Sequence, residues 1–507
     1  MEAQGQMAEQ ATNVRLHFPV ISQTNGRQTR ISIANPDPSA SLNVMFTAYL
    51  EGGTARAPQP RTVAANRQAS FLVSDLFPGV TRGTIIAEGQ GGGAMTGFYE
   101  IADSFTAPTM LGGAEGIQTP QPTLVFPVIK SSGQSATEIH VFNPNATTIS
   151  VRVAGFTAVG NRLDPTDIDG QTLDTIMLPP FGTLIVSSSE LSPAGDVRLD
   201  AAQLDGGYVV VETTDGQTVV GSELTQEPIS GQMSVAVLNG LSFPRGCLSS
   251  MATPCACQAD TSAASPVPSS LRQHTLYATY FEGNPAESIL YLVNVSDSPA
   301  EVAVSAFSEI GQFRGAFPTT GFVTVAPHQV FQAPVLSLFG FNPSPGYVRI
   351  EDQSSSFVGG IINRNAVSGR FATLVPLSPD NPQLTQTATD TFFSRVQLDP
   401  PSANPRQTTG MVILNPNNNS IRFRIKMTNS SGQVSQSQVQ ILAARSTFIA
   451  IRQSLSALFP NLNVSNGYAQ VLVTTAPGPG MGSRLIPVAV YRSSNIVSAV
   501  AQQNKQP

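Results

Sequence analysis

Residues 29–36 read TRISIANP, a short apolar strand that runs into Asn35 and Pro36, and the chain repeats this pattern. The counterparts are TEIHVFNP at 137–144, SILYLVNV at 288–295 and GMVILNP at 410–416, which contain Asn143, Asn294 and Asn415. Self-similarity at a regular spacing identifies a chain of repeated structural units before any functional motif is considered. The sequence therefore predicts four tandem modules.

Each copy has the same order of elements around its Asn. A strand with alternating polarity follows, most clearly at 149–153 (ISVRV) and 421–425 (IRFRI), where Arg152 and Arg422 fall between apolar residues. Successive side chains of a strand point to opposite faces, so this pattern indicates a half-buried antiparallel strand with its Arg side chains outward. Turns and further apolar runs complete about seven strands per copy, which is typical of a β-sandwich.

A strand that opens with Gly-Tyr occurs in three copies, at Gly207, Gly346 and Gly467, and the first copy has Gly83-Thr84 there. The Gly-Tyr strand follows a Leu-containing corner. This combination resembles the tyrosine corner of immunoglobulin-like and fibronectin type III sandwiches, where a Tyr hydroxyl bonds to upstream backbone. A simple core Tyr is the other interpretation. We predict an all-β chain of four tandem Ig-like antiparallel β-sandwich domains.

Taken together, the FPVI-like strands at 18–21 and 126–129, the Asn-Pro turn, the Pro-Pro-Phe-Gly turn at 179–182 and the Gly-Tyr-Val strand carry a family resemblance. They are similar to the tandem β-sandwich repeats of uncharacterised bacterial secreted or cell-surface proteins. The resemblance extends over residues 14–500. It implies an extracellular, multi-domain, non-enzymatic protein, and it brings no functional residues with it.

The domain boundaries follow from turn-rich stretches between the copies. We predict β-sandwich repeats at 14–112, 120–246, 271–380 and 388–501. A Cys/Pro/Ser-rich linker at 247–270 separates the second repeat from the third, because ASPVPSS at 264–270 has the composition of a connector.

Composition limits the class of protein. Hydrophobic residues make up 41% of the chain and charged residues 12%, with a net charge of −6. Such a chain is folded rather than disordered, and its weakly charged surface permits close packing of copies. No basic patch favours nucleic acid, and no apolar run of about 18 residues favours membrane insertion. The N-terminal residues lack the features of a signal peptide, so either the chain is cytoplasmic or the numbering begins after a removed leader or inside a longer protein. The β-repeat composition favours the second alternative, and we expect a location outside the cell or on its surface.

Cysteine occurs only at Cys247, Cys255 and Cys257. A disulfide that closes the Cys247–Cys255 or Cys247–Cys257 loop fits an extracellular setting and leaves one thiol over. Three thiols with no nearby His do not match the ligand patterns of zinc sites. A local disulfide is the favoured interpretation.

The best metal candidate is the acidic loop that contains Asp164, Asp167 and Asp169, because carboxylates at short spacing before a Gly suit calcium. The EF-hand register would require an acid at Pro165 and a Glu at Ile176. We therefore favour a solvated loop, and we predict neither a metal nor a cofactor.

No catalytic set emerges from the repeats, and no nucleophile elbow, metalloprotease motif or P-loop occurs. His140 occupies an outward strand position that Ser32 fills in the first copy. His328 lies at a turn tip equivalent to Asn66 and Phe181. Both are expected to be structural, and we predict that the chain is not an enzyme.

Two functions remain as hypotheses. The first is an extracellular structural protein that assembles with itself, in which the apolar strand with Leu16, Phe18, Val20 and Ile21 adds to the sheet of another copy. The second is a monomeric adhesin, an array of modules whose loops bind a glycan or another surface protein.

Overall fold

The computed structural model describes residues 14–501 apart from 24–25, 91–93, 106–110, 132–134, 168, 189–196, 230–231, 243–273, 282–285, 340–344, 353, 355, 366–372, 377, 380–390, 400–406, 451–454, 460–463, 475–484 and 494–495. The fold is all-β, as predicted, and the helices of the described residues are single turns. The strands form four sandwich-like units, which we call modules 1 to 4 in chain order.

The first two modules have the following elements. Module 1 contains β1 (Arg15–Ser22), β2 (Gln28–Asn35), β3 (Leu42–Tyr49), β4 (Gln59–Val63), β5 (Arg67–Leu72), α1 (Val73–Leu76), β6 (Arg82–Gln90), β7 (Thr96–Ala102) and β8 (Leu111–Glu115). Module 2 contains β9 (Thr123–Phe126), β10 (Ala136–Phe142), β11 (Ile149–Phe156), β12 (Arg162–Leu163), β13 (Ile176–Leu178), β14 (Thr183–Ser187), β15 (Val197–Arg198), α2 (Ala201–Leu204), β16 (Tyr208–Thr213), β17 (Val220–Ile229), β18 (Gln232–Asn239) and β19 (Leu241–Ser242).

The other two modules repeat this order. Module 3 contains β20 (His274–Phe281), β21 (Ala286–Asn294), β22 (Ala300–Ser308), β23 (Phe313–Phe317), β24 (Val323–Val325), β25 (Val330–Pro334), α3 (Val335–Phe339), β26 (Gly346–Asp352), β27 (Phe357–Asn365), β28 (Thr373–Pro376) and β29 (Ser378–Pro379). Module 4 contains β30 (Thr391–Leu398), β31 (Gln407–Leu414), β32 (Ile421–Asn429), β33 (Val434–Gln436), β34 (Gln440–Leu442), β35 (Thr447–Ile449), α4 (Leu455–Leu458), β36 (Val464–Val473), β37 (Ile486–Ser493) and β38 (Ile496–Ala501).

The order of the core strands is the same in every module, and modules 2 and 3 add a short strand, β19 or β29, beside their first strand. In module 1 one sheet has the order β1-β6-β3-β4 and the other β5-β2-β7-β8. An immunoglobulin sandwich instead places its first strand beside the second and its last beside the sixth. Here the first strand lies beside the sixth and the seventh beside the second, so the predicted Ig-like order is not confirmed. In module 4 the pair Leu398 and Thr408 joins the two sheets.

The predicted alternation of the third strand is present. Along β32 buried and exposed residues alternate, with Ile421, Phe423 and Ile425 in the core and Arg422 and Arg424 exposed. The same face of β11 buries Ile149, Val151 and Val153. Burial of one face of each sheet against the other is the main stabilising contribution to such a module.

The repeated Asn is a structural residue in all four modules. Asn35, Asn143, Asn294 and Asn415 are fully buried. Asn143 donates from Nδ2 to the carbonyl oxygens of Thr147, Leu178 and Pro179 at 2.8, 3.2 and 2.9 Å. The other three Asn residues make the equivalent three bonds. One amide therefore satisfies a carbonyl of the turn that follows its own strand and carbonyls at the end of another strand, which explains why the motif recurs.

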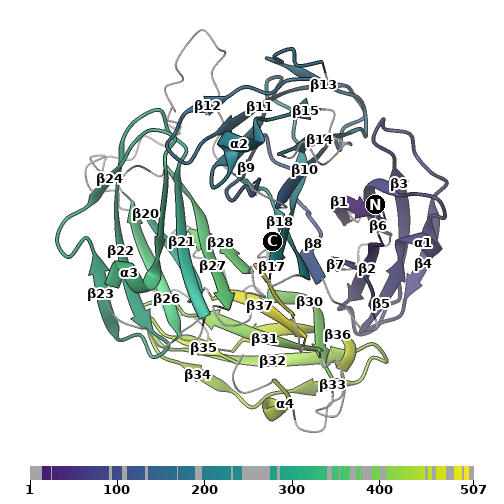
Figure 1. The fold of residues 1–507 in the computed structure, drawn as a ribbon. Helices are drawn as coiled ribbons and strands as arrows, with labels where there is room; N and C mark the ends of the chain where they lie inside the picture. Colours follow the sequence, from purple (N-terminus) through teal and green to yellow (C-terminus); the bar gives the residue numbers. More distant parts are fainter. Residues whose placement is uncertain are drawn as a thin grey trace, which may run out of the picture.

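The modules follow one another around a closed ring (Figure 1), with module 1 in purple and module 4 in yellow-green. The ring closes because β30 of module 4 packs against β2 and β7 of module 1. The last strands lie toward the middle, where β8 packs against β18 and β38, and β38 also against β28. The short strands β4, β13, β24 and β34 lie at the periphery (Figure 1).

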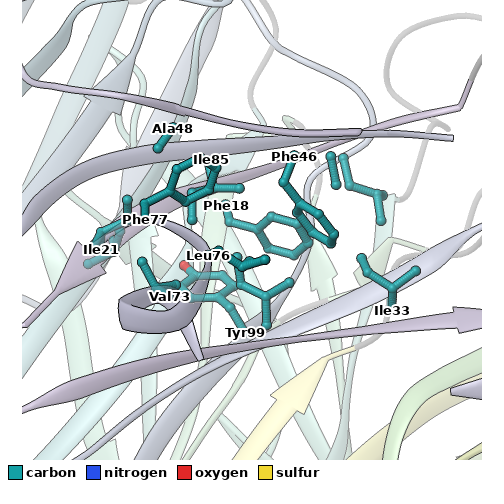
Figure 2. Close-up of a cluster of buried hydrophobic side chains, with 14 of the residues drawn as sticks. Phe18, Ile21, Ile33, Phe46, Ala48, Val73, Leu76, Phe77, Ile85 and Tyr99 are labelled. Atoms are coloured by element: carbon teal, nitrogen blue, oxygen red, sulfur yellow. The ribbon is translucent and has the colours of Figure 1, made fainter. Parts of the chain in front are cut away.

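The strand predicted to assemble with other copies lies inside module 1. Leu16, Phe18, Val20 and Ile21 are each at most 1% exposed and belong to the core of module 1. Figure 2 shows Phe18 and Ile21 among the core side chains of the other strands. The backbone of His17 also pairs with that of Ile117, at 2.9 Å in both directions. The apolar character of this strand therefore reflects burial within the molecule.

Candidate functional site

The most distinctive sites of this structure are the contacts between consecutive modules, which we call joints 1/2, 2/3, 3/4 and 4/1. Each joint is built on one residue with left-handed backbone, which we call the turn residue. The turn residues are Asn66, Phe181, His328 and Arg445, with φ of 54°, 55°, 56° and 53°. A positive φ is unfavourable for a non-glycine residue, so it persists only where surrounding contacts impose it.

The preceding module contacts the turn residue through a glycine turn. A Cβ placed on Gly53, Gly160 or Gly311 would lie 2.2, 2.6 or 2.5 Å from a carbonyl oxygen of the next module. Only glycine permits such an approach. A backbone hydrogen bond accompanies each of these three contacts: Thr183 N to Glu51 O at 2.8 Å, Val330 N to Ala158 O at 3.0 Å, and Thr447 N to Glu309 O at 2.7 Å.

The Tyr of each Gly-Tyr strand crosses the joint. The hydroxyl of Tyr347 donates to the carbonyl oxygen of Arg445 at 2.7 Å, and that of Tyr468 donates to Oδ1 of Asn66 at 2.7 Å. Tyr208 Oη lies 3.2 Å from Nδ1 of His328. The tyrosine-corner interpretation is therefore wrong, because these hydroxyls bond to the next module rather than to their own upstream backbone.

Module 1 has Thr84 where the others have Tyr, and its joint uses different side chains. Oγ1 of Thr84 lies 3.0 Å from Oγ1 of Thr183. The ring of Phe181, the turn residue of module 2, stacks on Tyr49 with a centroid distance of 4.8 Å. At joint 1/2 a contact between two Thr hydroxyls and an aromatic stack thus take the place of the Tyr hydroxyl.

His328 is the side chain of this set that most resembles a catalytic residue. It stacks on Phe156 at 4.5 Å, and its Nε2 lies 2.6 Å from Oδ1 of Asp297. Tyr208, Phe156 and Asp297 thus contact both ring nitrogens and one ring face. Because Tyr208 is fully buried, these contacts hold His328 within joint 2/3.

The other described His side chains also lie at a joint. His140 is 1% exposed and its Nε2 lies 3.4 Å from Glu138, which in turn pairs with Arg82 of module 1 at 2.8 Å. It points out of its own module, as predicted, but toward joint 1/2. Burial, with a smaller contribution from Arg15, lowers the pKa of His17 to about 3. His17 is therefore neutral at physiological pH.

Joint 4/1 contains a deeply buried ion pair. Arg395 of module 4 and Glu100 of module 1 are 2% and 4% exposed, and Nε donates to Oε1 at 2.7 Å. The other carboxylate oxygen, Oε2, accepts from Arg30 at 2.8 Å. Burial disfavours the charged carboxylate, but the two guanidinium groups outweigh it and hold the pKa of Glu100 below its ordinary value. One anion thus connects two modules.

Glu115, a second buried acid of joint 4/1, has a raised rather than a lowered pKa. Glu115 accepts hydrogen bonds from the backbone N and from Oγ of Ser394. Ser394 Oγ also contacts Oγ1 of Thr96, and the backbone carbonyl of Ser394 accepts from Nε2 of Gln68. Burial raises the pKa of Glu115 to about 8, and the bonds from Ser394 offset only part of this effect. The carboxyl is therefore mainly protonated at neutral pH.

This assignment predicts a pH-dependent effect of Glu115→Gln. The folded protein keeps the Glu115 proton up to about pH 8, whereas the unfolded chain releases it near 4.5. Stability therefore falls as pH rises between these values and is constant above them. A glutamine does not titrate and removes this pH dependence. The free energy of unfolding of the variant relative to the parent protein, measured with urea, should therefore rise between about pH 5 and pH 9. The exposed Glu88→Gln change is the control, and an equal effect of Glu115→Gln at both pH values would contradict the assignment.

Sequence reasoning did not find Glu223, which lies on β17 opposite Ile139. It is 4% exposed, and its Oε2 has no hydrogen-bond partner among the described residues. Burial raises its pKa well above the ordinary value, which favours the protonated form. Its partner Ile139 is a core residue four positions before Asn143 in the Asn motif. The position of Glu223 on the strand that pairs with this motif is the signal that could have identified it.

The predicted acidic loop is organised by its own backbone. Oδ1 of Asp167 accepts from the backbone N of Asp169 and Gln171 at 2.9 and 2.8 Å, and Asp164 pairs with Arg162 at 2.8 Å. Across the part of the chain that the structure describes, no group of three or more His, Cys, Asp or Glu could hold a metal ion. Cys247, Cys255 and Cys257 lie outside the described residues.

Neither the models of known protein families nor the characterised proteins compared with this chain match it. Among the described helices, none has the length and apolar character needed to cross a membrane.

The turn residues predict contrasting effects of glycine substitution. Arg445 contributes its carbonyl oxygen to Tyr347, which Arg445→Gly retains, so relief of the left-handed strain should leave stability unchanged or raise it by up to about 1 kcal/mol. His328→Gly relieves the same strain but removes the contacts to Phe156, Asp297 and Tyr208, so we expect a net loss of about 1–2 kcal/mol. Thermal unfolding of both variants tests this, and equal effects would contradict it.

Proposed function

We propose that this chain is a non-enzymatic structural protein located outside the cell, in which four β-sandwich modules form one rigid ring that serves as a building block. The observation that supports it best is the use of polar side chains. The polar side chains that lie at joints hold neighbouring modules together. They include Arg395, Glu100, Ser394, His328 and His140. Such an arrangement uses these side chains to fix the shape of the molecule.

The proposal assigns the partners as other copies of the chain or other surface proteins and glycans. It involves neither nucleic acid nor insertion into a membrane, in keeping with the weak net charge of −6. The extracellular location rests on the resemblance to secreted and cell-surface repeats. The finer immunoglobulin-like relationship is part of the same proposal, as a sandwich in which the first and seventh strands occupy exchanged positions.

The second candidate is a monomeric adhesin, and one observation favours it. Because joint 4/1 is closed, with Tyr468 bonded to Asn66 and Arg395 paired with Glu100, the ring presents no open terminal module to a partner. A monomer of this kind would bind through its peripheral loops. Replacement of the loop around Asp167 should then abolish binding to a glycan or surface protein without loss of stability.

Negative-stain electron microscopy with light scattering, on the full chain near neutral pH, tests the proposal. We expect compact ring-shaped particles, and ordered assemblies of such rings support the structural role. Rings that keep the mass of one chain at every concentration favour the adhesin. Extended strings of separate modules would contradict the ring and with it the proposed function.

A further inference from the structure

Joint 4/1 has a property that the other joints lack, because no peptide connection joins its two modules directly. It nevertheless uses the same elements as joints 2/3 and 3/4: a Gly-Tyr strand on one side, with Tyr468, and a turn residue on the other, with Asn66. The two contacting surfaces are different, so the joint is heterologous. Any second copy of the chain presents both surfaces and fits equally well.

The ring also divides into two halves, modules 1 and 2 and modules 3 and 4. Module 2 ends at Ser242 in β19 and module 3 begins at His274 in β20. The intervening residues 243–273 are the single covalent connection between the halves. A segment of about 30 residues reaches on the order of 100 Å when extended. Its length therefore permits one half to dock on a half of another chain while joints 2/3 and 4/1 keep their geometry.

The contacts that hold the halves together differ in character. Joint 2/3 buries an apolar cluster that includes Val125, Phe156, Tyr291 and Val293. Joint 4/1 combines buried polar contacts, Arg395 on Glu100 and Ser394 on Glu115, with the packing of Phe98 of module 1 against the apolar core of module 4. Both sets of side chains need a partner half, because isolated halves would expose the apolar cluster to water. They do not require that this half belong to the same chain.

We propose that the partner of these two joints can be a second copy of this chain, through exchange of halves. In the exchanged form, modules 1 and 2 of one copy and modules 3 and 4 of another form a ring with native joints. Reciprocal exchange gives a dimer, and exchange with successive copies gives a chain of rings connected by residues 243–273. The closed monomer is favoured at low concentration because its halves are tethered. The inference rests on the proposed structural function and supplies its mode of assembly.

Paired cysteines distinguish the two forms. Oγ1 of Thr96 contacts Oγ of Ser394 across joint 4/1, and Oγ1 of Thr84 lies 3.0 Å from that of Thr183 across joint 1/2. Thr96→Cys with Ser394→Cys can therefore cross-link the two halves. Thr84→Cys with Thr183→Cys is the matched control, because both residues belong to the same half. Cys247, Cys255 and Cys257 are replaced by Ser in both variants.

Each variant is unfolded, refolded at low and at high protein concentration, oxidised and analysed by non-reducing electrophoresis. At high concentration the joint 4/1 pair should shift from the mass of one chain to that of two or more, while the joint 1/2 pair stays at one chain. A joint 4/1 product with the mass of one chain at every concentration would overturn the exchange.

A second measurement covers the case in which a cysteine variant does not fold. Two unmodified chains that carry different affinity tags are refolded together at high concentration and purified through one tag. Recovery of the other tag after joint refolding, but not after mixing chains that were refolded separately, supports exchange, and equal recovery in both cases or no recovery overturns it. Ordered assemblies of rings without any exchange would leave the structural function intact and overturn only the exchange, whereas strings of separate modules would remove both.

Discussion

Glu100→Ala is expected to destabilise the protein by about 3–5 kcal/mol, which is the usual result when one partner of a buried ion pair is removed. The substitution leaves Arg395 at 2% exposure without its carboxylate and takes the same anion from Arg30. Urea unfolding followed by circular dichroism measures the effect. Hydrogen exchange in β7 and β30 should accelerate with it, because these strands meet at joint 4/1.

Two further variants make this expectation specific. Arg395→Met keeps Glu100 paired with Arg30, so its effect should be smaller than that of Glu100→Ala. Glu88→Ala removes an exposed ion pair, in which the side chain of Arg15 is 47% and that of Glu88 38% exposed. This change should lower the free energy of unfolding by no more than about 1 kcal/mol. If Glu88→Ala costs as much as Glu100→Ala, the buried pair does not hold the ring closed.

Asn143→Ala should cost about 3–5 kcal/mol, because three carbonyl oxygens lose their donor inside module 2. Each buried group left without a partner costs about 1–3 kcal/mol. The same substitution at Asn35, Asn294 or Asn415 should have a similar effect, since the three bonds recur there. Thermal and urea unfolding of the four variants provide the test.

The matched control is Asn43→Ala. Asn43 is exposed on β3 and accepts a single hydrogen bond, from Thr62 at 3.0 Å, so its loss should stay within about 0.5 kcal/mol. A small effect of Asn143→Ala, equal to that of Asn43→Ala, would show that water replaces the amide and that the motif is not required for stability.

The repeated units could be predicted from sequence because their pattern is local. The strand before each Asn and the alternation around Arg422 are contained within a few residues. The role of the Asn could not be predicted, because Asn143 bonds to Leu178 and Pro179, which lie at the end of another strand. Alternation reports which face of a strand is buried but not which distant carbonyl is nearby.

The first strand shows a different limit. β1 is apolar along most of its length. Such a sequence is compatible with an exposed edge strand that assembles with another copy of the chain. In the structure Phe18 faces the core of module 1, while His17 lies near Phe142 of joint 1/2, with ring centroids 6.1 Å apart. Both faces are therefore buried. A continuous apolar run is compatible with two-sided burial as well as with an exposed edge, so periodicity alone does not separate them.

Closure of the ring could not be predicted at all. Arg395 and Glu100 are nearly 300 positions apart, and neither belongs to a motif of the repeat. The Tyr-Asn66 contact likewise depends on the relative orientation of modules 4 and 1. Orientation is set by many joint contacts together, and no single stretch of sequence encodes it.

The turn residues have a consequence for how the chain folds. Tandem modules of similar structure are prone to wrong pairing during folding, because each unit offers nearly the same surface. Here the same backbone position carries Asn66, Phe181, His328 or Arg445. The first three meet different partners through their side chains: the hydroxyl of Tyr468 for Asn66, the ring of Tyr49 for Phe181, and the hydroxyl of Tyr208 with the ring of Phe156 for His328. A module that docked on the wrong neighbour would place Asn66 against the aromatic surface that fits Phe181, or Phe181 against a Tyr hydroxyl. The chemical difference between the joints therefore favours the native order of modules over its permutations.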